Sequence, residues 1–333
     1  MKRILALAAL AATALWGPAA SAEPATLKLS FFGPSTEVNY ARMIKPWLDA
    51  VNADPAGAVK IEAYPEGALG KALPAQPQMV LDGVADIAFI NSSLVPGRFP
   101  DDQVLELPGL FHSLDEAVKT YSTLLATHTL RGYDDYVVIG SMMNPNYQLF
   151  GRKPMHSLTD LQGMKVRIVG PMIGQTVKEL GMTPIMMPPT EVVEAMGRGT
   201  IDAATTVPAA LVDFGIDRVA PNEFMVPLGS GPLAVVMNRK KYESLPPAAQ
   251  ETLKKYDINW VNALYLKNLG SYNDSLIERF KSDPKRTVAT PNAADLDSLN
   301  KIYDGVIAAW VAKDERNAQV LAKVKAILAD LRK

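Results

Sequence analysis

An alternation of predicted strands and helices in the first third of the chain limits the possible folds more than any other feature. Residues 27–31 alternate apolar and polar side chains as a strand does, and 38–51 carry apolar residues at helical spacing. An alternating strand at 59–64, a helix at about 75–82 and a mostly apolar strand at 85–90 follow. Strands that alternate with helices usually pair in parallel through right-handed crossovers, so this segment predicts an α/β lobe.

The same pattern begins again in the middle of the chain and predicts a second α/β lobe. After strands at 136–140 and 147–150, the order strand, helix, strand, helix, strand recurs over 164–206, and strands at 224–228 and 233–238 return across the boundary. The predicted division therefore has a signal peptide and three further parts: 1–22 as the signal peptide, 23–143 with about 232–265 as lobe I, 144–231 with about 266–292 as lobe II, and 293–333 as C-terminal helices.

The longest periodic segment runs from about residue 248 to 281, where apolar residues recur at spacings of three and four. A helix of that length would extend about 50 Å at roughly 1.5 Å per residue, which exceeds the diameter of one small lobe. No heptad charge pattern suggests a coiled coil. We therefore predict a long helix that lies across both lobes and ties them together.

The first 22 residues are predicted to be a cleaved export signal. Lys2 and Arg3 precede an apolar run from Ile4 to Trp16, and Ala20-Ser21-Ala22 fits the small-residue cleavage pattern. Cleavage after Ala22 would leave a mature chain that starts at Glu23. With no cysteine and no later apolar stretch long enough to span a bilayer, the sequence predicts an exported, periplasmic protein.

The charged residues argue against several classes of function. The 34 basic and 35 acidic residues nearly cancel, giving a net charge of −1, and no basic run suggests nucleic acid as a partner. The three histidines, His112, His128 and His156, lack zinc-ligand spacing, so we predict no metal and no cofactor. No nucleophile elbow, phosphate-binding loop or dinucleotide fingerprint occurs, and the chain is predicted not to be an enzyme.

Arg167 is the strongest candidate for a ligand contact. Met164, Val166 and Ile168 alternate with Lys165 and Arg167, so the arginine points away from the apolar face of this strand. The strand ends at 169–171, before a helix, which is where open α/β sheets bind ligands. A guanidinium can hold a carboxylate through two parallel hydrogen bonds, although a surface ion pair would use the same residue type.

Several segments resemble the extracytoplasmic solute receptors of TRAP transporters, the DctP-like family. The resemblance is collinear over essentially the whole mature chain and rests on 82–87, 107–111, 160–168, 189–192, 198–203 and 245–247. It implies a type II-like periplasmic binding protein with two α/β lobes that close over a small-molecule organic anion. It also implies delivery to a small and a large membrane permease subunit driven by an ion gradient rather than by ATP.

The resemblance places Arg167 where the family holds a carboxylate, and it also implies the rest of the pocket. The family members that bind sugar acids carry a second arginine in the loop before lobe II, where the nearest residue here is Asn146, beside Met143. With one fixed positive charge and Phe32, Met143, Val207 and Phe224 around the cleft, a monocarboxylate with an apolar or aromatic body is the favoured ligand. The full predicted set is Arg167, Asn146, Phe32, Asn91, Met143, Pro189, Thr206 and Val207.

Three alternatives stay open at this point. C4-dicarboxylates or small keto acids would fit if Arg152 or Lys153 turned into the pocket. A receptor of an ATP-driven importer would share the two-lobe architecture, but the long helix argues against it. A periplasmic hydrolase would need a nucleophile and a base, and the sequence offers no convincing pair.

Overall fold

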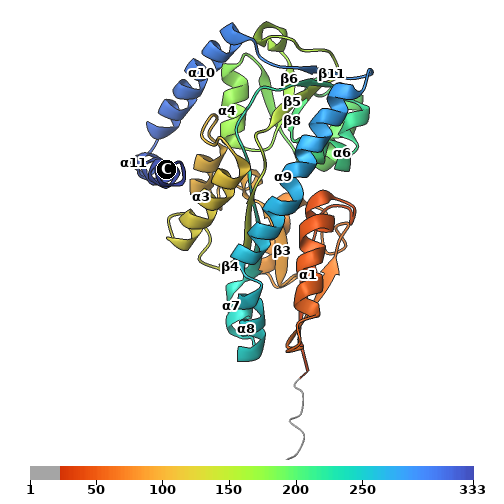
Figure 1. Cartoon of the computed structure of the whole chain (residues 1–333), viewed down its shortest axis with the longest axis vertical. Helices are drawn as coiled ribbons and strands as arrows, with labels where there is room; N and C mark the ends of the chain where they lie inside the picture. The colour runs from red at the N-terminus through yellow and green to blue at the C-terminus, as the bar shows by residue number, and fades with distance from the viewer. Residues whose placement is uncertain (1–22) are drawn as a thin grey trace, which may run out of the picture.

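The computed structural model describes residues 23–333, so the predicted signal peptide and its cleavage site lie outside the described residues. Two β-sheets, each covered by helices, form the two ends of the molecule, and one long helix runs past both (Figure 1). The predicted two-lobe α/β architecture is confirmed. The lobe boundaries drawn from the sequence stay a prediction.

The first sheet has the strand order β2-β1-β3-β10-β4. β1 pairs in parallel with both β2 and β3, as the alternation of strands and helices predicted, whereas β10 is antiparallel to β3 and β4. β3 is buried along its whole length, since it lies in the middle of the sheet. The strands are β1 (Ala25–Ser30), β2 (Val59–Tyr64), β3 (Ile87–Asn91), β4 (Tyr136–Met143) and β10 (Pro232–Asn238).

Short helical segments connect and cover the strands of this sheet. The first crossover contains a π-helical turn that leads directly into an α-helix. These segments are η1 (Tyr40–Ile44), α1 (Lys45–Asn52), η2 (Leu73–Ala75), α2 (Gln76–Leu81), η3 (Ser92–Leu94), η4 (Pro100–Glu106), α3 (Leu114–Ala126), α7 (Arg239–Glu243) and α8 (Pro247–Lys255).

The second sheet has the order β11-β9-β5-β8-β6-β7, and its β8, β6 and β7 are parallel neighbours. The carboxyl ends of these three strands therefore meet at one edge of the sheet. The strands are β5 (Gln148–Gly151), β6 (Lys165–Ile168), β7 (Thr183–Met186), β8 (Ala203–Thr206), β9 (Asn222–Phe224) and β11 (Thr287–Ala289). The helical segments here are η5 (Leu158–Leu161), α4 (Pro171–Glu179), η6 (Pro189–Glu191), α5 (Val192–Gly197), α6 (Pro208–Asp213) and η7 (Ile216–Arg218).

Two details of the predicted elements are wrong. The predicted strand at 224–228 ends at Phe224 as β9, and the pairing strand β11 was not predicted. The long helix predicted from 248 to 281 is divided into α8 and α9 (Ile258–Ser282). Asp257 causes the break, because its carboxylate accepts hydrogen bonds from the backbone N–H groups of Asn259 and Trp260 and so starts a new helix.

The α9 helix still connects the two halves of the molecule. It packs on β4 of the first sheet and on α6 and β11 of the second (Figure 1). At its centre, Asn273 accepts a hydrogen bond from the backbone N–H of Ala209 at the start of α6. The helix is thus a shared support, as the sequence predicted, although it is shorter than expected.

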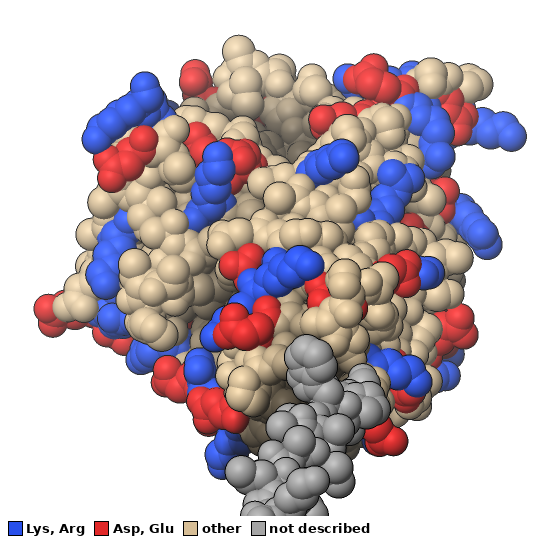
Figure 2. Space-filling view, turned by 60° about the horizontal axis from the view of Figure 1, so that its bottom comes forward, with Lys and Arg blue, Asp and Glu red and all other residues tan. Residues whose placement is uncertain are grey.

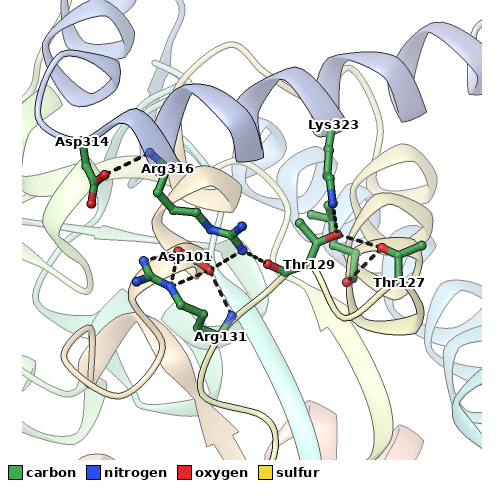
Figure 3. A network of polar contacts seen from close by, with 8 residues as sticks. Asp101, Thr127, Thr129, Arg131, Asp314, Arg316 and Lys323 are labelled. Carbon is green, nitrogen blue, oxygen red and sulfur yellow. Dashed lines mark hydrogen bonds and ion pairs between the residues drawn. The ribbon is translucent and has the colours of Figure 1, made fainter.

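The C-terminal helices α10 (Ala293–Val311) and α11 (Glu315–Leu331) fasten to opposite halves. α10 packs on α4, whereas α11 packs on α3 and η4. Asp101 of η4 is buried and accepts hydrogen bonds from Arg131 and from Arg316 of α11 (Figure 3). Burial opposes the charge, but the bonds from both arginines hold the pKa of Asp101 below its usual value, so the pair of cations keeps this carboxylate ionised.

The outer surface mixes charges of both signs. On the face shown in Figure 2, lysine and arginine side chains are interspersed with aspartate and glutamate rather than gathered in one patch. Among residues 23–333, no helix combines the length and apolar character that crossing a membrane requires.

Candidate solute-binding site

A cavity of about 50 Å³ lies where the two halves meet. Its walls come from the loop after β1, from the ends of β3, β6 and β8, and from α6. A single water needs roughly 10–15 Å³ of such volume, so the space holds more than one water-sized group. The residues that line it are Phe32, Glu37, Asn39, Leu73, Phe89, Asn91, Asn144, Tyr147, Arg167, Val169, Pro189, Thr206, Val207, Ala210, Phe214 and Leu233.

Arg167 is held at the edge of the second sheet by the two strands that flank β6. Its Nε donates to the carbonyl oxygen of Met187 at 2.9 Å, and its Nη1 donates to that of Thr205 at 2.8 Å. The Thr205 hydroxyl in turn donates to the Arg167 carbonyl oxygen at 3.0 Å. These bonds use two of the five N–H groups of the guanidinium and fix its plane, so the unused donors are at the Nη end.

The guanidinium of Arg167 is a buried charge with no carboxylate beside it. Its side chain is only 1% exposed, yet none of the salt bridges within residues 23–333 includes it. Burial lowers the pKa of Arg167 to about 10, which still leaves it protonated at neutral pH. A buried, unpaired cation is costly, so this site favours an anion that enters the cavity.

Tyr147 adds a second hydrogen-bond donor to the cavity. Its hydroxyl accepts a bond from Asn144 Nδ2 at 2.8 Å, which leaves the hydroxyl hydrogen for another acceptor. Burial raises the pKa of Tyr147 to about 12, so the hydroxyl keeps its proton at neutral pH. The cavity can therefore offer an anionic group both the charge of Arg167 and the hydroxyl of Tyr147.

Three aromatic rings form the apolar wall. Phe32 stacks on Phe89 with a centroid distance of 6.2 Å and on Phe214 with a distance of 6.0 Å, and the interplanar angles are 21° and 20°. Phe32 and Phe89 belong to the first half, whereas Phe214 follows α6 in the second half. The wall is therefore assembled from both sides of the cavity, and flat rings at this spacing suit a flat apolar ligand body.

Six of the eight predicted site residues line the cavity: Arg167, Phe32, Asn91, Pro189, Thr206 and Val207. These six residues line the cavity, and their contact with a solute stays a prediction. Arg152 and Lys153 are not among the lining residues, and Arg152 instead donates to the carbonyl oxygen of Met196 at 3.2 Å. Arg167 is therefore the only lysine or arginine among the residues that line this cavity.

Met143 and Asn146, the other two residues of the predicted set, are not among the residues that line the cavity. Met143 continues β4, pairs with Pro232 of β10 and is completely buried in the hydrophobic core. Tyr147 rather than Asn146 reaches the cavity, because its backbone is bonded on both sides by the segment 228–229. Phe224 is also absent from the wall, since it belongs to the core of the second half.

Sequence reasoning missed several lining residues, above all Glu37, Asn39, Tyr147 and Phe214. No local signal singled out Glu37, which precedes the helix predicted from residue 38, or Asn39, which lies in the first turn of that helix. Phe214 follows a helix too short to show a clear period. Within residues 23–333, no cluster of three or more histidine, aspartate or glutamate side chains is arranged to hold a metal ion.

Two carboxylates connect the halves around the cavity. Asp213, at the end of α6, accepts a hydrogen bond from the backbone N–H of Val38 at 3.0 Å. Glu106 of η4 accepts one from the backbone N–H of Met172, in the first turn of α4, at 3.1 Å. Burial raises the pKa of Glu106 to about 8. Through these two hydrogen bonds the halves are in direct contact.

The family model described as bacterial extracellular solute-binding protein, family 7 (DctP), matches residues 30–314 of the chain. The chain belongs to this family. The TRAP receptor family predicted from the sequence is confirmed, and the family is one of transport proteins that bind solutes rather than a class of enzymes. The cavity around Arg167 is accordingly the candidate solute site of a family 7 binding protein.

Two relatives are named as solute-binding proteins, and one of them is named for the solute that it binds. A solute-binding protein of Albidiferax ferrireducens is 26% identical over 217 residues, which cover 63% of this chain and 64% of that protein. The 2,3-diketo-L-gulonate-binding periplasmic protein YiaO of Escherichia coli is 27% identical over 213 residues, covering 63% and 65%. This chain therefore aligns with slightly less than two thirds of either relative.

Solved structures of TRAP solute-binding proteins share the fold over almost the whole chain. One from an unidentified marine microbe, described as specific for aromatic acid ligands and solved with 3-hydroxybenzoate, is 25% identical with a TM-score of 0.83, covering 93% of this chain and 100% of that one. Another, from Rhodoferax ferrireducens with copurified benzoate, is 22% identical with a TM-score of 0.80, covering 92% and 98%. The second likeness concerns the fold alone.

Proposed function

We propose that this family 7 protein is the periplasmic receptor of a TRAP transporter and that it binds an aromatic monocarboxylate between its two lobes. The ligand carboxylate pairs with Arg167, and the closed receptor delivers the acid to a small and a large permease subunit. The export signal ends at Ala22, and the receptor changes shape without catalysing a reaction.

The single observation that carries this proposal is the buried guanidinium of Arg167 without a carboxylate partner. Its Nε and one Nη1 hydrogen are occupied by carbonyl oxygens, so a ligand carboxylate would approach the Nη end and also accept from the Tyr147 hydroxyl. Because the guanidinium is buried, each charge-assisted bond is stronger there than at the surface.

The cavity favours one carboxylate on a flat apolar body. Arg167 is the sole cation in the wall, so a second ligand carboxylate would be left buried and unpaired, which argues against C4-dicarboxylates. The rings of Phe32, Phe89 and Phe214 face the same space. The relative that is 25% identical and specific for aromatic acids supports the same ligand class.

A thermal-shift screen of carboxylic acids on the mature protein tests the proposal. An aromatic monocarboxylate at a hundredfold excess over its Kd should stabilise the protein by about 2.7 kcal/mol, and a Tm increase of roughly 5 °C should follow. Arg167→Ala should weaken binding by roughly 30-fold or more and abolish that increase. Its own stability should not fall, because the substitution removes an uncompensated buried charge.

Arg152→Ala is the matched control, since Arg152 lies close in sequence but outside the cavity, and it should respond like the wild type. An unchanged response of Arg167→Ala would refute the anchor. A screen in which dicarboxylates stabilise the protein and aromatic monocarboxylates do not would refute the ligand class.

A further inference from the structure

The chain after β1 enters a helix at Val38, and Asn39 lies in its first turn with helical backbone angles. Glu37, the residue before this turn, caps the helix, because its Oε2 accepts hydrogen bonds from the backbone N–H groups of Asn39 at 2.8 Å and Tyr40 at 3.1 Å. The side chain of Asn39 makes no capping hydrogen bond.

The amide of Asn39 therefore has no capping role, and Glu37 fixes the orientation of this amide. Asn39 Nδ2 donates to Glu37 Oε1 at 2.7 Å, which turns the amide oxygen the other way. Asn39 is only 9% exposed and lines the cavity, and its Oδ1 is buried without a hydrogen-bond partner in the described residues. A buried amide oxygen without a partner costs about 1–3 kcal/mol, so the site is suited to a donor from outside the protein.

Closing of the lobes holds this acceptor in place. Val38, between Glu37 and Asn39, donates its backbone N–H to Asp213 of the other half at 3.0 Å. Phe214, the next residue after Asp213, stacks on Phe32 in the cavity wall. The amide oxygen of Asn39 therefore belongs to the wall that is complete only when both halves meet.

We infer that Asn39 Oδ1 accepts a hydrogen bond from a hydroxyl group on the ligand body, so that the receptor selects hydroxylated aromatic acids over their unsubstituted parents. This inference rests on the proposed function, because Arg167 is taken to hold the carboxylate of the same ligand. Glu37 acts as a positioning residue, since it orients the Asn39 amide.

Isothermal titration of the full mature protein with matched acids tests this selectivity. The probes are benzoate and phenylacetate, their ortho-, meta- and para-hydroxy derivatives, and the corresponding fluoro derivatives, which resemble a hydroxyl in size but donate no hydrogen bond. At least one hydroxy acid should bind the wild type about tenfold or more tightly than both its parent and its fluoro analogue. If no hydroxy acid exceeds its parent by threefold, the inference is overturned and the proposed function stands.

Substitution of Asn39 and of Arg167 distinguishes the role of the amide oxygen from that of the guanidinium. In Asn39→Leu the preference for the hydroxy acid over its parent should fall to threefold or less. Arg167→Ala should instead weaken the hydroxy acid and its parent alike. A hydroxyl preference that persists in Asn39→Leu would overturn the assignment of this acceptor.

Asn39→Ala is the second variant if Asn39→Leu does not fold, as judged by its thermal unfolding, and the same loss of preference is expected for it. The wild-type titrations need no variant at all and so decide the selectivity by themselves. If none of the aromatic acids binds the wild type, both the proposed function and this inference fail.

Discussion

The hydrogen bond from the backbone N–H of Val38 to Asp213 Oδ2, at 3.0 Å, joins the two halves at the rim of the cavity. We expect it to form only when the lobes close, so its free energy should contribute to ligand affinity rather than to the fold of either half. Burial raises the pKa of Asp213 to about 6, while the bond from Val38 opposes this effect. At pH 8 the carboxylate is therefore ionised.

Asp213→Ala removes the acceptor and leaves the N–H of Val38 without its partner. A lost hydrogen bond of this kind costs about 1–2 kcal/mol, which corresponds to a roughly 5- to 30-fold increase in Kd. Asp213→Asn keeps an oxygen acceptor and should raise Kd by less than about threefold. Neither variant touches Arg167, so both should still bind the acid.

Isothermal titration at pH 8 measures the Kd, and small-angle scattering with saturating ligand measures the compactness of the bound receptor. Asp274→Ala is the control, because Asp274 is exposed on α9 and carries the same charge. A Kd of Asp213→Ala within twofold of the wild type would show that this bond does not contribute to closure.

Two further predictions concern buried acids. Burial and then the charge of Asp213 raise the pKa of Glu37 from 4.5 to about 8, so the folded protein holds a proton on Glu37 that the unfolded chain releases between these values. This proton makes the free energy of unfolding fall as the pH rises from about 5 to 8, and Glu37→Gln should reduce the fall of Tm over this range. Equal slopes of Tm against pH for the variant and the wild type would contradict the pKa shift. Gly170→Ala places a methyl group against the carboxylate of Glu106, which must then leave the N–H of Met172, and we expect a loss of about 1–3 kcal/mol in thermal unfolding. Gly305→Ala on α10, where nothing lies within 4 Å, should cost nothing, and equal effects of the two glycine variants would refute the clash.

The strands around the anchor could be predicted because their patterns are local. Alternation over 164–168 indicated a strand, and the break after it indicated that Arg167 lies at a carboxyl end. In the structure Arg167 lies there, between β8 and β7. The strand β6 and the position of Arg167 at its carboxyl end could thus be predicted from short-range periodicity.

Loop side chains could not be placed in this way. Met143 looked like a loop residue, but β4 continues through it because Pro232, almost 90 residues later, pairs with it. Tyr147 turns into the cavity because its N–H donates to Gly229 at 2.7 Å and its carbonyl oxygen accepts from Leu228 at 3.0 Å. Such bonds join segments far apart in sequence, and no pattern around residue 147 encodes them.

The sequence by itself determined a two-lobe α/β solute-binding fold with one strand-end arginine, since hydrophobic periodicity and motif order are properties of neighbouring residues. Only the tertiary structure decided that this guanidinium is buried without a carboxylate, that Tyr147 and Asn39 share its cavity, and that Asp257 divides the long helix. The physical reason is that burial and hydrogen-bond partners depend on which distant segments meet when the lobes pack together.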